Sequence, residues 1–193
     1  MRTLNLSRLL PLATLAAALL AAPTVLRAQM PAPVPGVTTV IVVRHAEKAT
    51  DDPQDPALTP AGHARAAVLA QMLNGTTVSA IYTTQYKRTH ETAEPLSAAS
   101  GVAVTERPIG AANSATYAQD LAREIMATQR GKTVVVVGHS NTVPAIVQAL
   151  SGQTVPDIAD TEYDHLFVVQ IPATGTPTVL SNHYGLRTGS TVL

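Results

Sequence analysis

The sequence predicts an α/β fold, a three-layer sandwich with a mostly parallel central sheet flanked by helices. Residues 38–43 and 133–137 are continuous β-branched runs without polar alternation, which is typical of parallel strands buried on both faces. Between and after these runs, helical patterns alternate with shorter strand patterns, as in layered α/β domains. Ligands of such folds bind beyond the carboxyl ends of the strands, so the residues that follow the two runs are the first candidates for a functional site.

The first helix is expected to begin with Thr59 as its N-cap and Pro60 at its first position, and to end at Asn74-Gly75. Its predicted inward face consists of Ala64, Val68 and Met72. A second helix is expected over 86–93, because Pro95 should kink or end it. The remaining predicted elements are strands over 79–83, 166–171 and 178–180, a helix over 114–130 with Leu121, Ile125 and Met126 inward, and a helix over 143–150 opened by Pro144.

The first 28 residues have the pattern of a secretory signal peptide. Arg2 and Arg8 precede an apolar run over 9–22, and small residues lead to an expected cleavage after Ala28. The run is shorter than the ~20 residues of a membrane span, so no stable span is expected after cleavage; a retained anchor is the alternative. Residues 29–37 form an extended lead-in to one domain over 38–193. The predicted location is periplasmic or secreted.

Composition narrows the function classes. The chain has 13 Lys+Arg against 13 Asp+Glu, and only 13% of its residues are charged, against roughly 25% in an average domain. With five Tyr, one Phe and no Trp, it offers neither a basic surface nor a stacking platform, so nucleic acid is not an expected partner. The absence of cysteine excludes disulfides, thiolate nucleophiles and zinc–thiolate sites.

A histidine follows each of the two strand runs. Arg44-His45 comes after the first run, and Gly138-His139 comes after the second. The planar guanidinium group of arginine can donate hydrogen bonds to two oxygens of a phosphoryl group at once, and Arg44 and Arg88 are suited to this role. A neutral imidazole at His45 could attack phosphorus and form a phosphohistidine, while His139 and backbone N–H groups of the following helix would meet the developing charge. This chemistry calls for no metal and no other cofactor.

Four motifs occur in order: Arg44-His45-Ala46-Glu47-Lys48, Leu58-Thr59-Pro60-Ala61-Gly62, Arg88-Thr89-His90-Glu91-Thr92-Ala93 and Gly138-His139-Ser140. Together they resemble the histidine phosphatase (phosphoglycerate mutase-like) superfamily over residues 38–184, and the chain is similar to its small phosphatase branch, which includes phosphohistidine phosphatases. The resemblance implies that His45 is the phosphorylated nucleophile and that Arg44, Arg88 and His139 complete the phosphate pocket.

Two further residues are candidates for substrate binding. Glu47 either orients a pocket arginine or faces water. Asn141 is a candidate ligand, although it and Thr142 could instead cap the following helix. The expected substrate is a phosphorylated small molecule or a phosphoprotein, with specificity set by the loops 48–57 and 106–116.

The chain departs from the family pattern at two points. Ala46 replaces the usual glycine, a change of one methyl group that we expect to be tolerated. Ser140 stands where the acid phosphatase branch has an aspartate that protonates the leaving group. In the mutase branch the acid follows the second arginine motif, and Glu106 is the carboxylate nearest to that position in this sequence. Without an acid, the enzyme would favour leaving groups that need little protonation, as in phosphoanhydrides, aryl phosphates or phosphohistidine.

Two other functions stay open. Residues 138–142 differ at one residue from the Gly-x-Ser-x-Gly elbow of serine hydrolases, in which Ser140 would be the nucleophile, and Asp164 and His183 lie downstream. However, Thr142 replaces the last glycine of the elbow, and the sequence has no glycine run for an oxyanion hole. A non-catalytic phosphate-binding protein of the same fold is the second alternative, because the acid is missing.

The other polar residues are expected to be structural or exposed. His63, His90, His165 and His183 occur singly and without the spacing of metal ligands. Asp51, Asp52 and Asp55 are interpreted as part of a solvated flap, and the acidic run over 157–164 as a connection before a strand.

Overall fold

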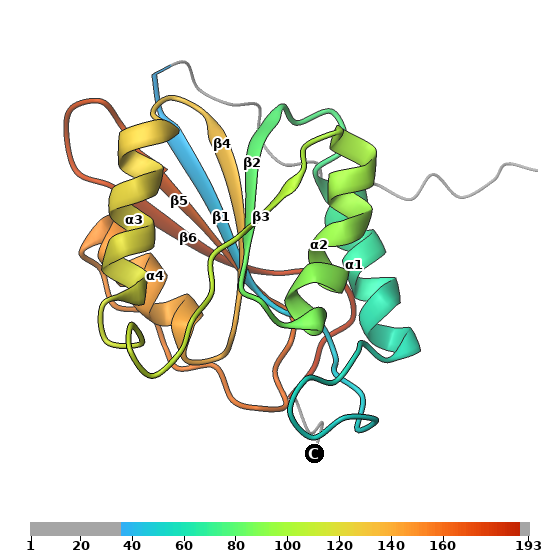
Figure 1. The fold of residues 1–193 in the computed structure, drawn as a ribbon. Helices are drawn as coiled ribbons and strands as arrows, with labels where there is room; N and C mark the ends of the chain where they lie inside the picture. The colour runs from blue at the N-terminus through green and yellow to red at the C-terminus, as the bar shows by residue number, and fades with distance from the viewer. Residues whose placement is uncertain (1–35, 190–193) are drawn as a thin grey trace, which may run out of the picture.

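The computed structural model describes residues 36–189 and contains a central sheet covered by helices on both faces (Figure 1). Its strands are β1 (Thr38–Arg44), β2 (Val78–Thr83), β3 (Val104–Glu106), β4 (Thr133–Gly138), β5 (His165–Ile171) and β6 (Thr178–His183). Its helices are α1 (Pro60–Met72), α2 (Lys87–Ser100), α3 (Tyr117–Thr128) and α4 (Thr142–Ser151). The predicted signal peptide and nearly all of the predicted lead-in lie outside the described residues.

The strand order is β3-β2-β4-β1-β5-β6. The first four strands in this order are parallel, and β5 and β6 add an antiparallel edge. The predicted three-layer α/β sandwich with a mostly parallel sheet is therefore confirmed. The central strands β1 and β4 are in register to their carboxyl ends, where Arg44 pairs with Gly138. This register places the two histidine motifs side by side.

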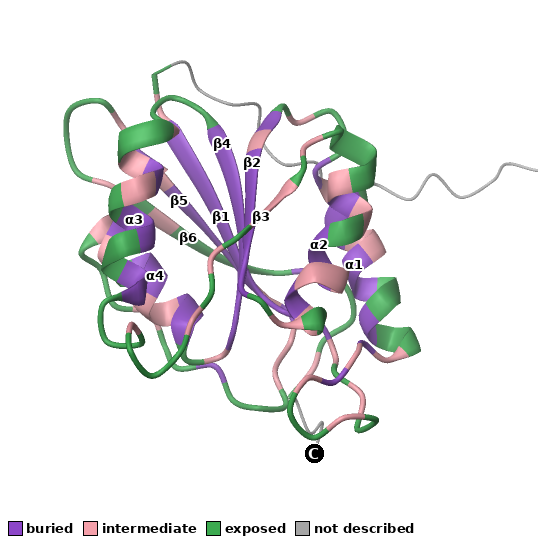
Figure 2. Cartoon of the chain, viewed as in Figure 1, coloured by how far each residue is buried: buried purple, intermediate pink, exposed green. Residues whose placement is uncertain are grey.

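The core has one layer on each face of the sheet. In β1, Val40 and Val42 pack under α3 and α4, whereas Ile41 and Val43 pack under α1 and α2. Every residue of β1 and β4 is buried (Figure 2), because successive side chains point to opposite faces and both faces are covered. The unbroken apolar runs in the sequence follow from this burial.

Helix α1 begins as predicted, with the Thr59 hydroxyl accepting a hydrogen bond of 3.1 Å from the Gly62 N–H group. Its predicted inward face was wrong: Ala64 is exposed, and Val68 and Met72 are only half-buried. The buried face consists of Gly62, Arg65, Ala66, Leu69 and Ala70. Helix α1 is turned this way because its buried arginine has a carboxylate partner, described below, so an apolar pattern alone identified the wrong face.

Helix α2 does not end before Pro95, as the predicted range 86–93 implied, but continues to Ser100. Beyond the proline, Leu96 is buried in the core, and Gly101 ends the helix with a φ of 72°. Tertiary packing thus outweighs the backbone hydrogen bond that proline removes. The other differences are smaller: α3 begins at Tyr117 instead of Ser114 and ends at Thr128, β6 extends to His183, and β3 was not predicted.

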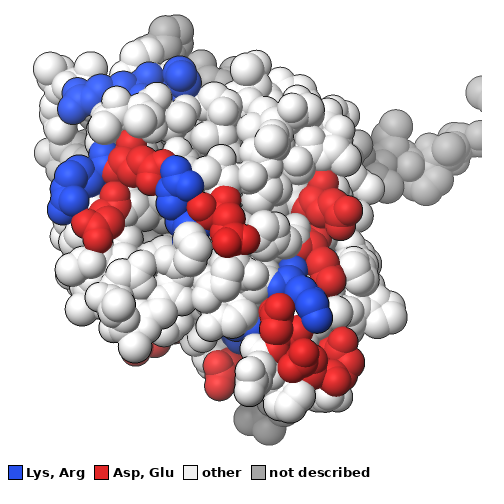
Figure 3. All heavy atoms as spheres, viewed as in Figure 1, with Lys and Arg blue, Asp and Glu red and all other residues white. Residues whose placement is uncertain are grey.

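Charged side chains of both signs lie next to one another on the face shown in Figure 3. Two ion pairs between charged side chains are Arg107 with Glu124 and Arg123 with Asp120, at nitrogen–oxygen distances of 2.5 and 2.9 Å. Within residues 36–189, none of the helices combines the length and the apolar character needed to cross a membrane.

Candidate active site

A cavity of about 360 Å³ lies at the carboxyl ends of β1 and β4. Five of the predicted site residues line it: Arg44, His45, Arg88, His139 and Asn141. Arg44 is the last residue of β1, His45 and His139 directly follow β1 and β4, and Arg88 lies in the first turn of α2. The strand-end argument therefore located residues that come together in space.

The orientation of His45 is fixed by its backbone neighbours. The backbone N–H group of His45 donates to the Gly138 carbonyl at 2.9 Å, and the ring atom Nδ1 lies 2.8 Å from the Ala46 carbonyl oxygen. Since a carbonyl can only accept, Nδ1 carries the hydrogen and Nε2 keeps its lone pair. Burial, with a smaller contribution from Arg44, lowers the pKa of His45 to about 3. The imidazole is thus neutral at neutral pH, as a nucleophile must be.

His139 lies against His45, with ring centroids 5.4 Å apart. Its Nε2 atom is 2.9 Å from the hydroxyl of Thr84, which in turn is 3.1 Å from the hydroxyl of Thr89. Burial and the charges of Arg88 and Arg44 lower the pKa of His139 to about 4. This ring is therefore also neutral, and the threonine pair holds it in place.

Arg44 is almost completely buried and is held by the segment before β5. One terminal nitrogen, Nη1, donates to the carbonyls of Ala159 and Glu162, both at 2.7 Å, and the guanidinium carbon lies 4.2 Å from the centre of the Tyr163 ring. Burial lowers the pKa of Arg44, but an arginine stays charged at neutral pH. Its buried Nε atom has no hydrogen-bond partner among the described residues.

Arg88 has a similar environment. Its guanidinium lies over the ring of Tyr86 at 4.3 Å, and its Nη1 atom is 3.8 Å from a carboxylate oxygen of Asp55. Burial lowers its pKa, and its Nε atom is likewise buried without a partner in the described structure. Buried donors are normally hydrogen-bonded, so two unpartnered guanidinium N–H groups beside one cavity indicate a site for an anion.

The start of α4 supplies further donors. The Thr142 hydroxyl accepts from the His139 N–H group at 2.8 Å, and the N–H groups of Thr142 and Val143 donate to the His139 carbonyl. Within residues 36–189, the N–H groups of Ser140 and Asn141 have no such partner, and the Asn141 side chain makes no capping bond. Free N–H groups at a helix start attract anions, as predicted for this turn.

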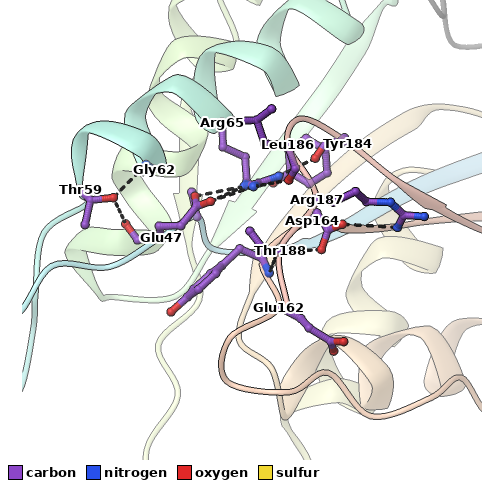
Figure 4. Close-up of polar contacts among 12 residues, drawn as sticks. Glu47, Thr59, Gly62, Arg65, Glu162, Asp164, Tyr184, Leu186, Arg187 and Thr188 are labelled. Atoms are coloured by element: carbon purple, nitrogen blue, oxygen red, sulfur yellow. Dashed lines mark hydrogen bonds and ion pairs between the residues drawn. The ribbon is translucent and has the colours of Figure 1, made fainter. Parts of the chain in front are cut away.

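Glu47 does not line the cavity, contrary to its prediction as a substrate-binding residue. Its carboxylate accepts hydrogen bonds from Nε and Nη2 of Arg65, the shortest at 2.8 Å (Figure 4). Arg65 also donates to the carbonyls of Tyr184 and Leu186. A buried guanidinium needs a counter-charge, so Glu47 joins α1 and the C-terminal segment to the turn after His45 and does not contact this pocket.

Glu106 is not a cavity residue either. Its carboxylate lies 3.1 Å from Nε2 of His90. The carboxylate that lines the cavity is that of Asp160, whose side chain is 96% exposed and lies 3.9 Å from Nη2 of Arg44. Glu106, the candidate for the general acid, therefore does not reach the cavity. In the described structure, no carboxyl group that lines the cavity is buried, although burial is what would keep such a group protonated.

Sequence reasoning missed the residues that support the pocket. Tyr86, Tyr163 and Asp160 lie in loops without a recognisable pattern. Thr92 could have been found within the third motif: its hydroxyl accepts from the Ala46 N–H group at 2.9 Å and donates to the Arg88 carbonyl at 2.6 Å. The methyl group of Ala46 is buried beside Leu58 and Ala66, so this departure from glycine is accommodated.

The serine hydrolase alternative gains nothing from the geometry. Ser140 lines the cavity, but no hydrogen bond in residues 36–189 joins it to an imidazole. His183 is paired with Asp164 at 2.9 Å, at the opposite edge of the sheet from β2 and β3.

Comparison with protein families matches residues 40–109 to the model of the histidine phosphatase superfamily (branch 1). These residues contain the first three motifs, including His45 and both pocket arginines. Over this segment the chain is similar to the histidine phosphatase superfamily. No curated protein sequence matches the chain.

Solved structures of several phosphatases share its fold. A mycobacterial glucosyl-3-phosphoglycerate phosphatase is 14% identical with a TM-score of 0.58, and the match covers 77% of this chain and 98% of that one. The protein histidine phosphatase SixA, complexed with tungstate, is 20% identical with a TM-score of 0.56, covering 75% and 96%. A phosphoserine phosphatase from Entamoeba histolytica is 16% identical with a TM-score of 0.54, covering 77% and 98%. At these identities the structures establish the fold.

Proposed function

We propose that this protein is an exported phosphatase that transfers the phosphoryl group of its substrate to His45 and then to water, without a metal ion. The central support is a neutral imidazole with a free Nε2 beside two buried arginines whose Nε atoms lack partners. The match of residues 40–109 to the histidine phosphatase model and the phosphatases among the structural neighbours support a phosphatase.

In the first step, Nε2 of His45 attacks phosphorus, a P–N bond forms, and the leaving group departs with the electrons of its bond to phosphorus. The Nδ1–H group keeps its hydrogen bond to the Ala46 carbonyl, which stabilises the positive charge on the ring. Arg44, Arg88 and the N–H groups at the start of α4 hold the transferring oxygens. Water then attacks phosphorus, which releases phosphate and restores neutral His45.

The chemistry of the leaving group follows from the missing proton donor. His139 is neutral, with a pKa of about 4, and the Asp160 carboxylate lies in water. A substrate whose leaving group is a weak base therefore suits this site best, as in an aryl phosphate, a phosphoanhydride or phosphohistidine. The hydrolysed compound would be a phosphorylated small molecule or a phosphoprotein.

Export is the part of the proposal that rests on the sequence. The basic start, the apolar run over 9–22 and the small residues before Gln29 support cleavage and release into the periplasm or the medium.

Hydrolysis of p-nitrophenyl phosphate, an aryl phosphate, tests the proposal. With a chelator present, we expect turnover by the wild-type protein and a loss of about 10³-fold or more in His45→Ala. His63→Ala removes an exposed histidine of α1 and is the matched control that should keep the wild-type rate. Equal rates in the wild type and His45→Ala would contradict the proposal.

The missing acid keeps one competing function open, a non-catalytic phosphate-binding protein. Calorimetry with inorganic phosphate separates it from the phosphatase. Binding of phosphate by a wild-type protein that turns over no aryl phosphate would favour the binding protein.

A further inference from the structure

A second group of ligand-type side chains lies outside the cavity, where β5 begins and β6 ends. It consists of Asp164, His165 and His183, and one potential ligand atom from each lies within 4.8 Å of those of the other two. We propose that these three residues bind a divalent transition-metal ion, with Zn²⁺ the best match. None of them lines the phosphatase cavity, so the site is separate from the proposed function.

The register of the β5–β6 hairpin creates the histidine pair. His165 and His183 are directly opposite each other on neighbouring antiparallel strands, and their ring centroids are 4.6 Å apart. Residues opposite each other point to the same face of a sheet. The sequence did not predict a site because the ligands are brought together by strand pairing and not by helical or loop spacing.

Asp164 completes the group as a buried and fixed carboxylate. Its Oδ2 atom lies 2.9 Å from Nδ1 of His183, and its Oδ1 atom accepts from the Thr188 hydroxyl at 2.8 Å. A carboxylate paired with an imidazole recurs in metal sites, either as a ligand beside the histidine or as the group that orients it. Thr188 holds Asp164 in position for either role.

The local charge also favours a cation. Besides Asp164, Glu162 places a carboxylate oxygen 3.3 Å from Nε2 of His165. The opposing charge is Arg187, whose Nη1 atom is 3.4 Å from Oδ2 of Asp164 and whose side chain is 65% exposed (Figure 4). Because it is exposed, this side chain can move into water when an ion binds.

The donor set indicates the kind of ion. Two imidazoles and a carboxylate suit zinc, nickel or copper, whereas magnesium and calcium prefer oxygen ligands alone. Bonds of about 2 Å place ligand atoms on one zinc ion about 3 to 4 Å apart, so a separation of up to 4.8 Å closes with small side-chain rotations. His165 is half-buried and His183 is exposed, which leaves the ion a path from solvent.

The test is titration of the untagged, chelator-treated protein with ZnCl₂ in a calorimeter. We expect one Zn²⁺ site, no site for Mg²⁺, and a loss of affinity of about 100-fold or more in both His165→Gln and His183→Gln. A Tm that rises by roughly 5 to 10 °C at 100 times the Kd would accompany binding. Asp164 is left intact because replacing so buried a carboxylate could prevent folding.

Two further variants sharpen the result. His90→Gln alters another histidine–carboxylate pair, with Glu106, and should bind Zn²⁺ as the wild type does. Arg187→Ala removes the opposing charge and should lower the Kd, an effect that a purely structural hydrogen-bond network would not produce. Absence of Zn²⁺ binding, or binding that survives both His165→Gln and His183→Gln but is lost in His139→Ala, would overturn the proposal.

Discussion

At the scale of single residues, the environment of the two cavity histidines determines their chemistry. Burial lowers the pKa of His45 to about 3 and that of His139 to about 4, and the nearby guanidinium groups act in the same direction. The buried Arg44 and Arg88 make an anion, and not a cation, the favourable occupant of the space between them. The buried arginines therefore help to keep the nucleophile His45 neutral and also favour an anionic ligand.

This burial should make stability depend on pH. In the unfolded chain both imidazoles take up protons near pH 6.5, while in the folded protein they stay neutral down to about pH 3 and 4. The unfolded state then binds more protons, so their contribution to stability falls as the pH is lowered from about 6.5 to 4. Urea unfolding at pH 7, 6, 5 and 4 should show a shallower decline for the double variant His45→Ala, His139→Ala. Equal declines would contradict the assigned burial.

Particular residues show which parts of the site could be predicted from the sequence. Arg44, His45 and His139 could be predicted because polar residues directly after all-apolar strands must emerge at one edge of the sheet. Glu47 could not be assigned, because its partner Arg65 comes from a helix face that the apolar pattern identified wrongly. Tyr163 and Asp160 reach the site through a loop, and their positions depend on the backbone contacts of Arg44.

At the scale of elements, the start of α1 is packed directly against the segment that follows the nucleophile. The Thr59 N–H group donates to the Glu47 carbonyl at 2.8 Å, and Gly62 lies so close that a Cβ atom would overlap the same carbonyl oxygen. The second motif is explained by this contact, since only glycine allows α1 to approach residues 46–48.

Gly62→Ala should therefore lower both stability and activity. Overpacking against backbone costs about 1 to 3 kcal/mol, and the displaced segment carries the carbonyl of Ala46 that orients His45. Thermal unfolding and aryl phosphate hydrolysis measure the two effects. Gly110→Ala is the stability control, because a Cβ atom there meets nothing within 4 Å and φ is not positive. A Gly62→Ala protein as stable as Gly110→Ala would show that the contact is not tight.

At the scale of the whole molecule, the layer architecture was predictable and the sheet order was not. Alternating strands and helices with two fully apolar strands require a covered, mostly parallel sheet, whatever the order of its strands. The β5–β6 edge is antiparallel, and its pairing brings Asp164, His165 and His183 together from residues that are unremarkable in sequence. Long-range pairing of this kind leaves no local pattern.

The proposed export is also a property of the whole chain. When the full gene product is made in a cell with a secretory pathway, we expect the protein outside the cytoplasm with Gln29 as its first residue. Fractionation followed by N-terminal sequencing measures this. A full-length protein that stays in the membrane fraction would indicate the retained anchor instead.

The most direct test of the central claim is to trap the covalent intermediate. The protein is mixed with a ³²P-labelled aryl phosphate, quenched within milliseconds in alkali, which preserves a P–N bond, and digested for mass spectrometry. We expect one phosphate on His45 and none in His45→Ala. Label on Ser140, or turnover without any labelled protein, would contradict it.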